Sequence, residues 1–213
     1  MIAVADLDQG LARLVASGIT LPDGIAHPLA GYLALLAKWN GTYNLTAIRE
    51  PERMVTHHVL DALAILPHLP DRRSLRLADV GSGGGVPGVP LAIARPEWFV
   101  SLIDSNHKKG SFLQQVAAEL SLGNVEIVTK RVEEHHPAEL FDVVVSRAFS
   151  DLETFVAVGL PLLAPDGRLV AMKGVFPYEE LTEVAADVRV LGTYPVSVPG
   201  LDAERHVVIM ARA

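Results

Sequence analysis

The pattern of hydrophobic positions changes near residue 70. Before that point, apolar residues recur every three or four positions, which predicts amphipathic helices. One helix is expected from Asp6 to Gly18, a second along the stripe from Leu29 to Trp39, and a third from Pro51 to Leu66. Glycine after the first stripe and proline at the start of the third are typical helix boundaries. Residues 1–70 are therefore predicted to form a helical cap.

After residue 71, short runs of Val, Ile and Leu alternate with helical stretches, which is typical of a parallel sheet buried on both faces. The expected strands cover 75–80, 99–104, 125–128, 141–146 and 168–173, with helices at 111–123 and 151–167. Two further apolar runs, 188–198 and 206–212, flank a Pro-Gly turn and are expected to pair as an edge hairpin. Residues 71–213 thus predict a Rossmann-like, mostly parallel α/β core with a C-terminal edge hairpin. With its cap, the chain 1–213 is expected to be a single domain.

Composition narrows the class of protein. The 213 residues carry a formal net charge of −7 and include no cysteine. This composition excludes a disulfide framework, a thiolate nucleophile and a cysteine-ligated zinc site. No apolar run is long enough to span a bilayer, and Asp6 and Asp8 lie where a signal peptide would carry Lys or Arg. We expect a cytoplasmic protein with no membrane contact, and nothing in the sequence demands more than a monomer.

The segment LADVGSGGGVPGVPLAI, from Leu77 to Ile93, is the strongest chemical signal. It follows a predicted strand and precedes a helix, where ligands bind in parallel α/β sheets, and its glycines allow close backbone approach. Asp104 ends the next strand, where a carboxylate can accept hydrogen bonds from a ribose diol. Read from Asp79 to Gly85, the loop suits S-adenosylmethionine. Read from Gly83 to Gly88, it matches the dinucleotide fingerprint, so an NAD-dependent oxidoreductase stays open.

Further motifs follow in a fixed order along the chain. They are WNGTYNLTAI, HHVLDAL, DVGSGGGVPGVPLAI, DSNHKKGSFL, KRVEE, SRAF, MKG and ERHVV. From Leu29 to Ala211 the chain resembles the bacterial small-subunit ribosomal RNA guanine-N7 methyltransferases, also called the glucose-inhibited division protein B family. The resemblance implies a class I S-adenosylmethionine-dependent methyltransferase fold. It also implies methyl transfer from S-adenosylmethionine to guanine N7 in 16S ribosomal RNA, with that RNA or the small ribosomal subunit as partner.

The glycine loop and the resemblance together define a set of expected site residues. In the resemblance, Val132 and Glu133 match the pair that flanks the adenine, and Arg147 matches a position counted with the cofactor or substrate. Arg147 is also the one candidate for a catalytic role. The expected cofactor-binding residues are Asp79, Gly81, Gly83, Gly85, Val86, Asp104, Ser105, Val132, Glu133 and Arg147.

Several cations follow the ends of the predicted strands and are expected to form a local rim beside the cofactor. Such a rim could hold an RNA loop on an acidic protein, because phosphate contacts dominate RNA affinity. The expected RNA-binding residues are Lys108, Lys109, Arg147, Lys173 and Asn44. His57 and Asp61 lie four residues apart, but no third ligand follows at suitable spacing, so we expect no metal and favour a polar link between cap and sheet. The roles of His57, His58 and His206 stay open.

The residues also bear on the chemistry. Guanine N7 carries an in-plane lone pair and no proton, so its methylation needs alignment rather than a general base. The segment after the fourth strand, SRAFSD, lacks the Asn/Asp-Pro-Pro-aromatic signature of exocyclic amine methylation, and the missing cysteine excludes the covalent route to pyrimidine carbon 5. A non-catalytic RNA-binding module on the same fold remains an alternative, since fold alone does not prove activity.

Overall fold

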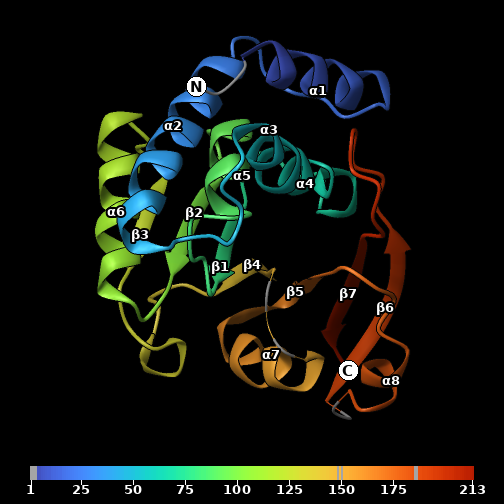
Figure 1. The fold of residues 1–213 in the computed structure, drawn as a ribbon. Coiled ribbons are helices and arrows are strands. Elements are labelled where there is room, and N and C mark those ends of the chain that lie inside the picture. The colour runs from blue at the N-terminus through green and yellow to red at the C-terminus, as the bar shows by residue number, and fades with distance from the viewer. Residues whose placement is uncertain (1–3, 148, 150, 185–186) are drawn as a thin grey trace.

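The computed structural model describes residues 4–147, 149, 151–184 and 187–213. Its centre is a seven-stranded sheet with the order β3-β2-β1-β4-β5-β7-β6 (Figure 1). Neighbours from β3 to β5 are parallel, whereas β7 is antiparallel to both β5 and β6. The strands are β1 (Arg76–Val80), β2 (Phe99–Ile103), β3 (Val125–Val128), β4 (Phe141–Ser146), β5 (Leu163–Lys173), β6 (Val188–Pro195) and β7 (His206–Arg212). The strand order reverses between β1 and β4, which creates a switch point at their carboxyl ends.

Helices cover both faces of this sheet. Those of the cap lie with α5 on one side, while α7 and α8 lie on the other (Figure 1). The α-helices are α1 (Val4–Ala16), α2 (Ala26–Tyr43), α3 (Pro51–Met54), α4 (Asp61–Leu63), α5 (Gly88–Ala94), α6 (His107–Glu119), α7 (Leu152–Gly159) and α8 (Tyr178–Thr182). The shorter segments are a π turn, η1 (Val55–Leu60), and the 3₁₀ turns η2 (Leu66–His68), η3 (Val132–Glu134) and η4 (Leu160–Leu162). None of the helices in the described part of the chain is long and apolar enough to cross a membrane.

A separate hydrophobic core lies on each face of the sheet. Val143 and Val145 of β4 point into the core that the cap shares, and Val144 between them points into the core under α7. Side chains alternate across a strand, so a strand buried on both sides needs an uninterrupted apolar run. This explains why the strands of the parallel core could be located from sequence. It also shows that the cap and the sheet share one continuous core, which reaches from Leu7 to Val207.

The expected third helix is interrupted. Its predicted apolar face is buried, but the chain forms a π turn over Val55–Leu60 between α3 and α4. In that turn the Asp61 N–H donates to the Thr56 carbonyl, a spacing of five residues. Turns of this kind often occur at functional sites. Here the turn carries His58, and Asp61 follows it directly; both side chains are buried.

The predicted end of the helix over 151–167 is wrong. Helix α7 stops at Gly159, and β5 begins at Leu163, which pairs with Phe141. Pro161 and Pro165 lack the N–H that a helix would need there. A Cβ on Gly159 would lie 3.0 Å from the Leu169 side chain, so this glycine allows the helix to end against the strand.

The edge hairpin is confirmed. Its last strand, β7, is the inner one and pairs with β5, so β6 forms the outer edge and ends at Pro195.

Candidate functional site

Three adjoining hollows lie at the carboxyl ends of β1, β2, β4 and β5. The acid hollow, about 270 Å³, is lined by Val80, Gly81, Ile103, Asp104, Ser105, Lys130, Arg131, Val132, Glu133 and Phe149. The glycine hollow, about 200 Å³, is lined by Leu36, Leu45, Thr46, His58, Gly81, Ser82, Gly83, Gly84, Val86, Lys109 and Arg147. The wide hollow, about 610 Å³, is lined by Thr46, Ala47, Ile48, His57, His58, Asp61, Arg147, Phe149, Met172, Lys173, Gly174, Val175, Glu180 and Arg205.

Shared residues make these hollows one cleft. Gly81 lines both the acid hollow and the glycine hollow. Thr46, His58 and Arg147 line both the glycine hollow and the wide hollow. Phe149 is common to the acid and wide hollows. Most of the expected cofactor residues therefore lie around one cleft at the switch point, and residues 148 and 150 of the SRAFSD segment lie outside the described residues.

The glycines of the loop have different roles. Gly81 and Gly83 have φ angles of 75° and 56° and line the cleft, as a site with close backbone approach requires. Gly85 is different, because a Cβ there would lie 2.6 Å from Val89 and 2.9 Å from Leu113. Its glycine is needed for packing against α5 and α6, and it is not among the residues that line the described hollows. Gly85 therefore has a packing role, and its contact with the cofactor stays a prediction.

Asp79 stabilises the glycine loop from the buried side. Its Oδ2 accepts a hydrogen bond of 2.8 Å from the Gly88 N–H, at the start of α5. The side chain is fully buried and does not line the hollows, and Oδ1 has no hydrogen-bond partner among the described residues. Burial raises the pKa of Asp79 to about 7, although the Gly88 hydrogen bond and the Arg147 charge lower it. The first N–H of α5 is thus taken by Asp79.

A tyrosine hydroxyl from the cap also stabilises this loop. Tyr32 of α2 donates a 2.7 Å hydrogen bond to the Gly84 carbonyl, and its complete burial raises the pKa of the phenol. The sequence pattern places Tyr32 only in an apolar stripe, since helical periodicity detects a buried ring but not the partner of its hydroxyl.

Asp104 is the acid of the acid hollow. Its Oδ2 accepts from the Gly83 N–H at 3.0 Å and from Lys109 Nζ at 3.1 Å, while Oδ1 accepts from the Asn106 N–H at 2.9 Å. A carboxylate has about four lone-pair sites, so acceptor capacity remains on Oδ1. Lys109, expected to bind RNA, turns toward this acid and lines the glycine hollow.

Arg147, at the end of β4, belongs to a buried polar cluster. Its Nη1 donates to the His57 carbonyl and lies 3.3 Å from Oδ2 of Asp61, and Arg205 Nε donates to Oδ1 of Asp61 at 3.1 Å. Asp61 is therefore held between two guanidinium groups, one from the sheet and one from the segment before β7. The expected polar link between cap and sheet is confirmed for Asp61. In the described part of the chain, no group of three His, Cys, Asp or Glu side chains could hold a metal.

The protonation state of the neighbouring His58 determines which hydrogen bonds Thr46 accepts and donates. Burial and the Arg147 charge lower the pKa of His58 to about 4, so its ring is neutral near pH 7. Arg147 Nη2 lies 3.4 Å from His58 Nδ1, and a guanidinium can only donate, which assigns the proton to Nε2. Nε2–H then donates to Thr46 Oγ1 at 3.0 Å, and the Ile48 N–H donates to the same oxygen at 3.1 Å. With both lone pairs used, the Thr46 hydroxyl can make a further hydrogen bond only as a donor, and Thr46 lines both the glycine hollow and the wide hollow.

The remaining expected RNA-binding residues have partners of their own. Lys173 Nζ donates to Glu180 Oε2 at 2.7 Å, while its side chain still lines the wide hollow. Lys108 Nζ lies 5.8 Å from the Tyr43 ring centroid. Asn44 caps α2 with a φ of 51°, and its Oδ1 accepts from Arg49 Nη2 at 2.8 Å. Neither Lys108 nor Asn44 is among the residues that line the three hollows, and their contact with RNA stays a prediction.

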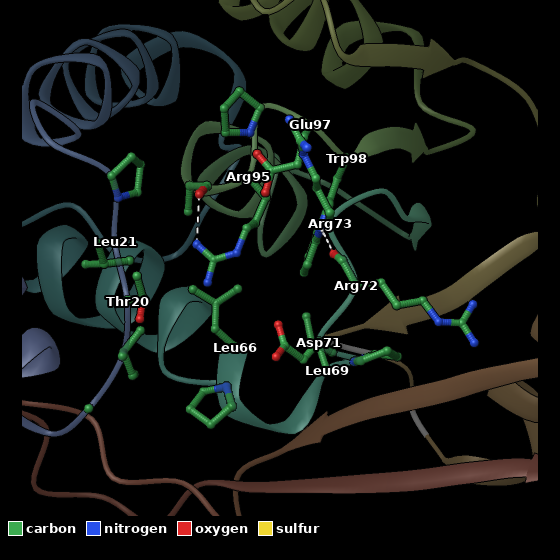
Figure 2. Close-up of a pocket in the computed structure, with 17 residues that line it drawn as sticks. Thr20, Leu21, Leu66, Leu69, Asp71, Arg72, Arg73, Arg95, Glu97 and Trp98 are labelled. Atoms are coloured by element: carbon green, nitrogen blue, oxygen red, sulfur yellow. Dashed lines mark hydrogen bonds between the residues drawn. The ribbon is translucent and has the colours of Figure 1, made fainter.

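A separate cavity of about 710 Å³, larger than any one of the three hollows, lies at the opposite, amino end of the strands (Figure 2). Figure 2 shows Arg95, Trp98 and Leu66 among the side chains that line it. Arg95 donates to the Ala94 carbonyl, and Arg72 pairs with Asp142 at 3.0 Å. The cavity contains none of the expected site residues, so size alone does not identify the functional site.

The parallel sheet, its antiparallel edge pair and a cleft at the switch point define a class I methyltransferase fold. The structure is similar to coclaurine N-methyltransferase bound to N-methylheliamine and SAH, with a TM-score of 0.61 and 12% identity, covering 98% of this chain and 88% of that one. It is also similar to a SAM-dependent methyltransferase from Aquifex aeolicus, with a TM-score of 0.59 and 17% identity, covering 76% of this chain and 93% of that one.

Sequence comparisons identify the family. The family model described as rRNA small subunit methyltransferase G matches residues 25–208. Ribosomal RNA small subunit methyltransferase G of Chromobacterium violaceum is 55% identical over 206 residues, which cover 97% of this chain and 96% of that protein. The protein of the same name from Aromatoleum aromaticum is 48% identical over 215 residues, with 99% and 100% covered. The chain therefore belongs to the rRNA small subunit methyltransferase G family, and the oxidoreductase alternative is dropped.

Proposed function

We propose that the protein transfers the methyl group of S-adenosylmethionine to N7 of a guanine in 16S ribosomal RNA. The observation that carries this proposal is the continuity of the cleft. The acid hollow holds a carboxylate suited to a ribose, the wide hollow is lined by hydrogen-bond donors such as Thr46 and Arg147, and both adjoin the glycine hollow. Membership of the rRNA small subunit methyltransferase G family supports the class of reaction and substrate.

The residues of the acid and glycine hollows fit this cofactor. Asp104 retains acceptor capacity for a ribose hydroxyl, and Ser105 lies beside it in the same hollow. Val132 and Glu133 line the part of the hollow where they would flank an adenine. Gly81 and Gly83 leave room where side chains would intrude. When bound, S-adenosylmethionine supplies an electrophilic methyl group on a sulfonium.

The wide hollow would receive the guanine. The Hoogsteen edge of guanine presents two acceptors, N7 and O6, so protein donors can orient the base without blocking N7 if they bind O6. Thr46 has the required hydroxyl hydrogen, and it lies where the wide hollow meets the glycine hollow. Arg147 lies at the same junction, held there by Asp61. In this arrangement the side chains act by positioning, because N7 has no proton to remove.

A methyl-transfer assay tests the proposal. Radiolabelled S-adenosylmethionine is offered with unmodified 16S RNA and, separately, with intact small subunits, and the products are analysed as nucleosides. We expect label in 7-methylguanosine. Gly81→Asp should abolish both cofactor binding and transfer, because it places a side chain at a φ of 75° beside the cleft. The matched variant Gly123→Asp, at a glycine with open space around it, should keep both. Label in another nucleoside, or no binding of S-adenosylmethionine by the wild-type protein, would refute the proposal.

A further inference from the structure

The segment between β5 and α8 exposes an unusual amount of apolar surface. Val175 is 75% exposed and Tyr178 is 74% exposed, whereas the other exposed large hydrophobic side chains of the described chain reach at most 53%. The Phe176 ring lies against Tyr178, with centroids 4.3 Å apart, and meets the His206 ring edge-on at 5.4 Å. We call Phe176, Tyr178 and His206 the aromatic ledge.

The ledge is fixed beside the mouth of the wide hollow. Gly174 and Val175 line that hollow, so the same short segment forms both the hollow and the ledge. His206 Nδ1 donates to the Gly174 carbonyl at 3.1 Å, which ties the start of the segment to β7. At the other end, Glu180 of α8 accepts from Lys173 Nζ and from the Leu152 N–H. The exposed Tyr178 ring and the partly buried rings beside it are therefore held in place relative to the hollow.

We propose that the aromatic ledge stacks a base of single-stranded RNA next to the guanine that enters the wide hollow; this inference rests on the proposed function. Enzymes that act on one base commonly extrude it from the stack, which leaves the neighbouring base without a partner face. Exposed aromatic rings supply such a face, and stacking on them is the usual way in which proteins hold unpaired bases.

The charges around the ledge favour a base there over a phosphate. Glu179 follows Tyr178 directly, and an acidic side chain repels the RNA backbone, whereas the charge of Glu180 is balanced by Lys173. The cations of this region, Lys173 and Arg205, line the wide hollow. The RNA strand would therefore run with one base over the Tyr178 ring and with its phosphate backbone toward the wide hollow.

The test uses single-stranded RNA transcripts of the methylated 16S region with 2-aminopurine at positions flanking the target guanine. Stacking on Tyr178 should quench the 2-aminopurine fluorescence at one flanking position. We expect Tyr178→Ala to lose this quenching and to bind the RNA about tenfold more weakly, equivalent to about 1.4 kcal/mol. Tyr178→Phe keeps the ring and should behave as the wild type. Tyr194→Ala is the matched control, because Tyr194 is also exposed but lies on β6, stacked on His68.

The outcomes separate this proposal from the proposed function. Binding of S-adenosylmethionine should be unchanged in all three variants, which shows that they fold. If the wild-type protein methylates guanine N7 but Tyr178→Ala binds and quenches like the wild type, the ledge proposal is wrong and the proposed function stands. If Tyr178→Ala loses activity only on intact subunits and not on naked RNA, the ledge contacts a ribosomal protein and the proposal is also wrong. A wild-type protein that methylates no RNA contradicts the proposed function itself.

Discussion

Arg147 Nη1 lies 3.3 Å from Oδ2 of Asp61, although the two residues are 86 positions apart in the sequence. The Asp61 side chain belongs to the cap and is 3% exposed, whereas Arg147 directly follows the central strand β4. The pair therefore joins the two parts of the chain at the point where the glycine hollow meets the wide hollow. It holds Arg147 in the cleft and leaves part of the guanidinium exposed there.

Asp61→Asn should destabilise the protein, because Arg147 and Arg205 would lose their shared counter-ion in a largely buried site. Breaking a buried pair costs about 3–5 kcal/mol, and partial exposure of both guanidinium groups reduces this to about 1–3 kcal/mol. Urea unfolding measures the change in the free energy of unfolding. Glu50→Gln, which removes the exposed partner of Arg53, is the control and should leave that free energy unchanged. Equal stability of Asp61→Asn and wild type would mean that the cluster does not hold the cap to the sheet.

Asp79→Asn should change how stability depends on pH. The pKa of Asp79 is raised to about 7 in the folded protein, so between pH of about 4 and 7 the folded state holds a proton that the unfolded state releases. The contribution of Asp79 to the free energy of unfolding is therefore greatest below a pH of about 4 and falls as the pH rises to 7. The Asn side chain can still accept from the Gly88 N–H, but it does not titrate.

His58 has the opposite effect on the pH dependence of stability. Its pKa is lowered to about 4, so protonation favours the unfolded state below pH 6.5, and stability from this group rises between pH 4 and 6.5. In the wild type the two trends oppose each other. Asp79→Asn should expose the His58 trend, with a slope of at most about 1.4 kcal/mol per pH unit. Urea midpoints from pH 4.5 to 7.5 test this, and parallel profiles for variant and wild type would contradict it.

The sequence predicted those features of the molecule that depend on local pattern. Runs such as Phe141–Ser146 revealed the buried strands, and Asp104 could be placed at the edge because it ends one of them. Contacts between distant segments left no such signal. An apolar stripe does not indicate that the Tyr32 hydroxyl donates to the Gly84 carbonyl, and the ERHVV motif does not indicate that Arg205 donates to Asp61.

The sequence alone also could not predict which acidic residues and glycines of the loop line the cleft. Asp79, Gly85 and Gly81 share one motif, yet only Gly81 lines the cleft. Asp79 instead accepts a hydrogen bond from the Gly88 N–H, and Gly85 is required because Val89 and Leu113 approach closely. The pattern of a motif indicates where a ligand binds, but three-dimensional packing determines which of its residues face that ligand.

Thr46→Val should lower methyl transfer without preventing cofactor binding. The substitution keeps the shape of the side chain but removes the hydroxyl that accepts from His58 and Ile48 and that is left to donate into the cleft. We expect a loss of about tenfold in kcat/KM for RNA, consistent with one lost hydrogen bond to the substrate and unsatisfied buried donors. Thr46→Ser retains the hydroxyl and should recover most of the activity. If Val and Ser variants were equally active, the hydroxyl would have no part in orienting the guanine.

Lys173→Ala should weaken RNA binding and leave the affinity for S-adenosylmethionine unchanged. Lys173 lines the wide hollow but is paired with Glu180, so part of any loss could come from the acid left unpaired. The double variant Lys173→Ala/Glu180→Gln removes that repulsion, and Glu180→Gln alone frees the lysine. If Lys173 contacts a phosphate, both variants that lack it should show a plot of log affinity against log salt that is shallower by about one. Glu180→Gln should keep the wild-type slope and bind RNA at least as tightly. Identical slopes in all four proteins would show that Lys173 serves only to hold α8 against the sheet.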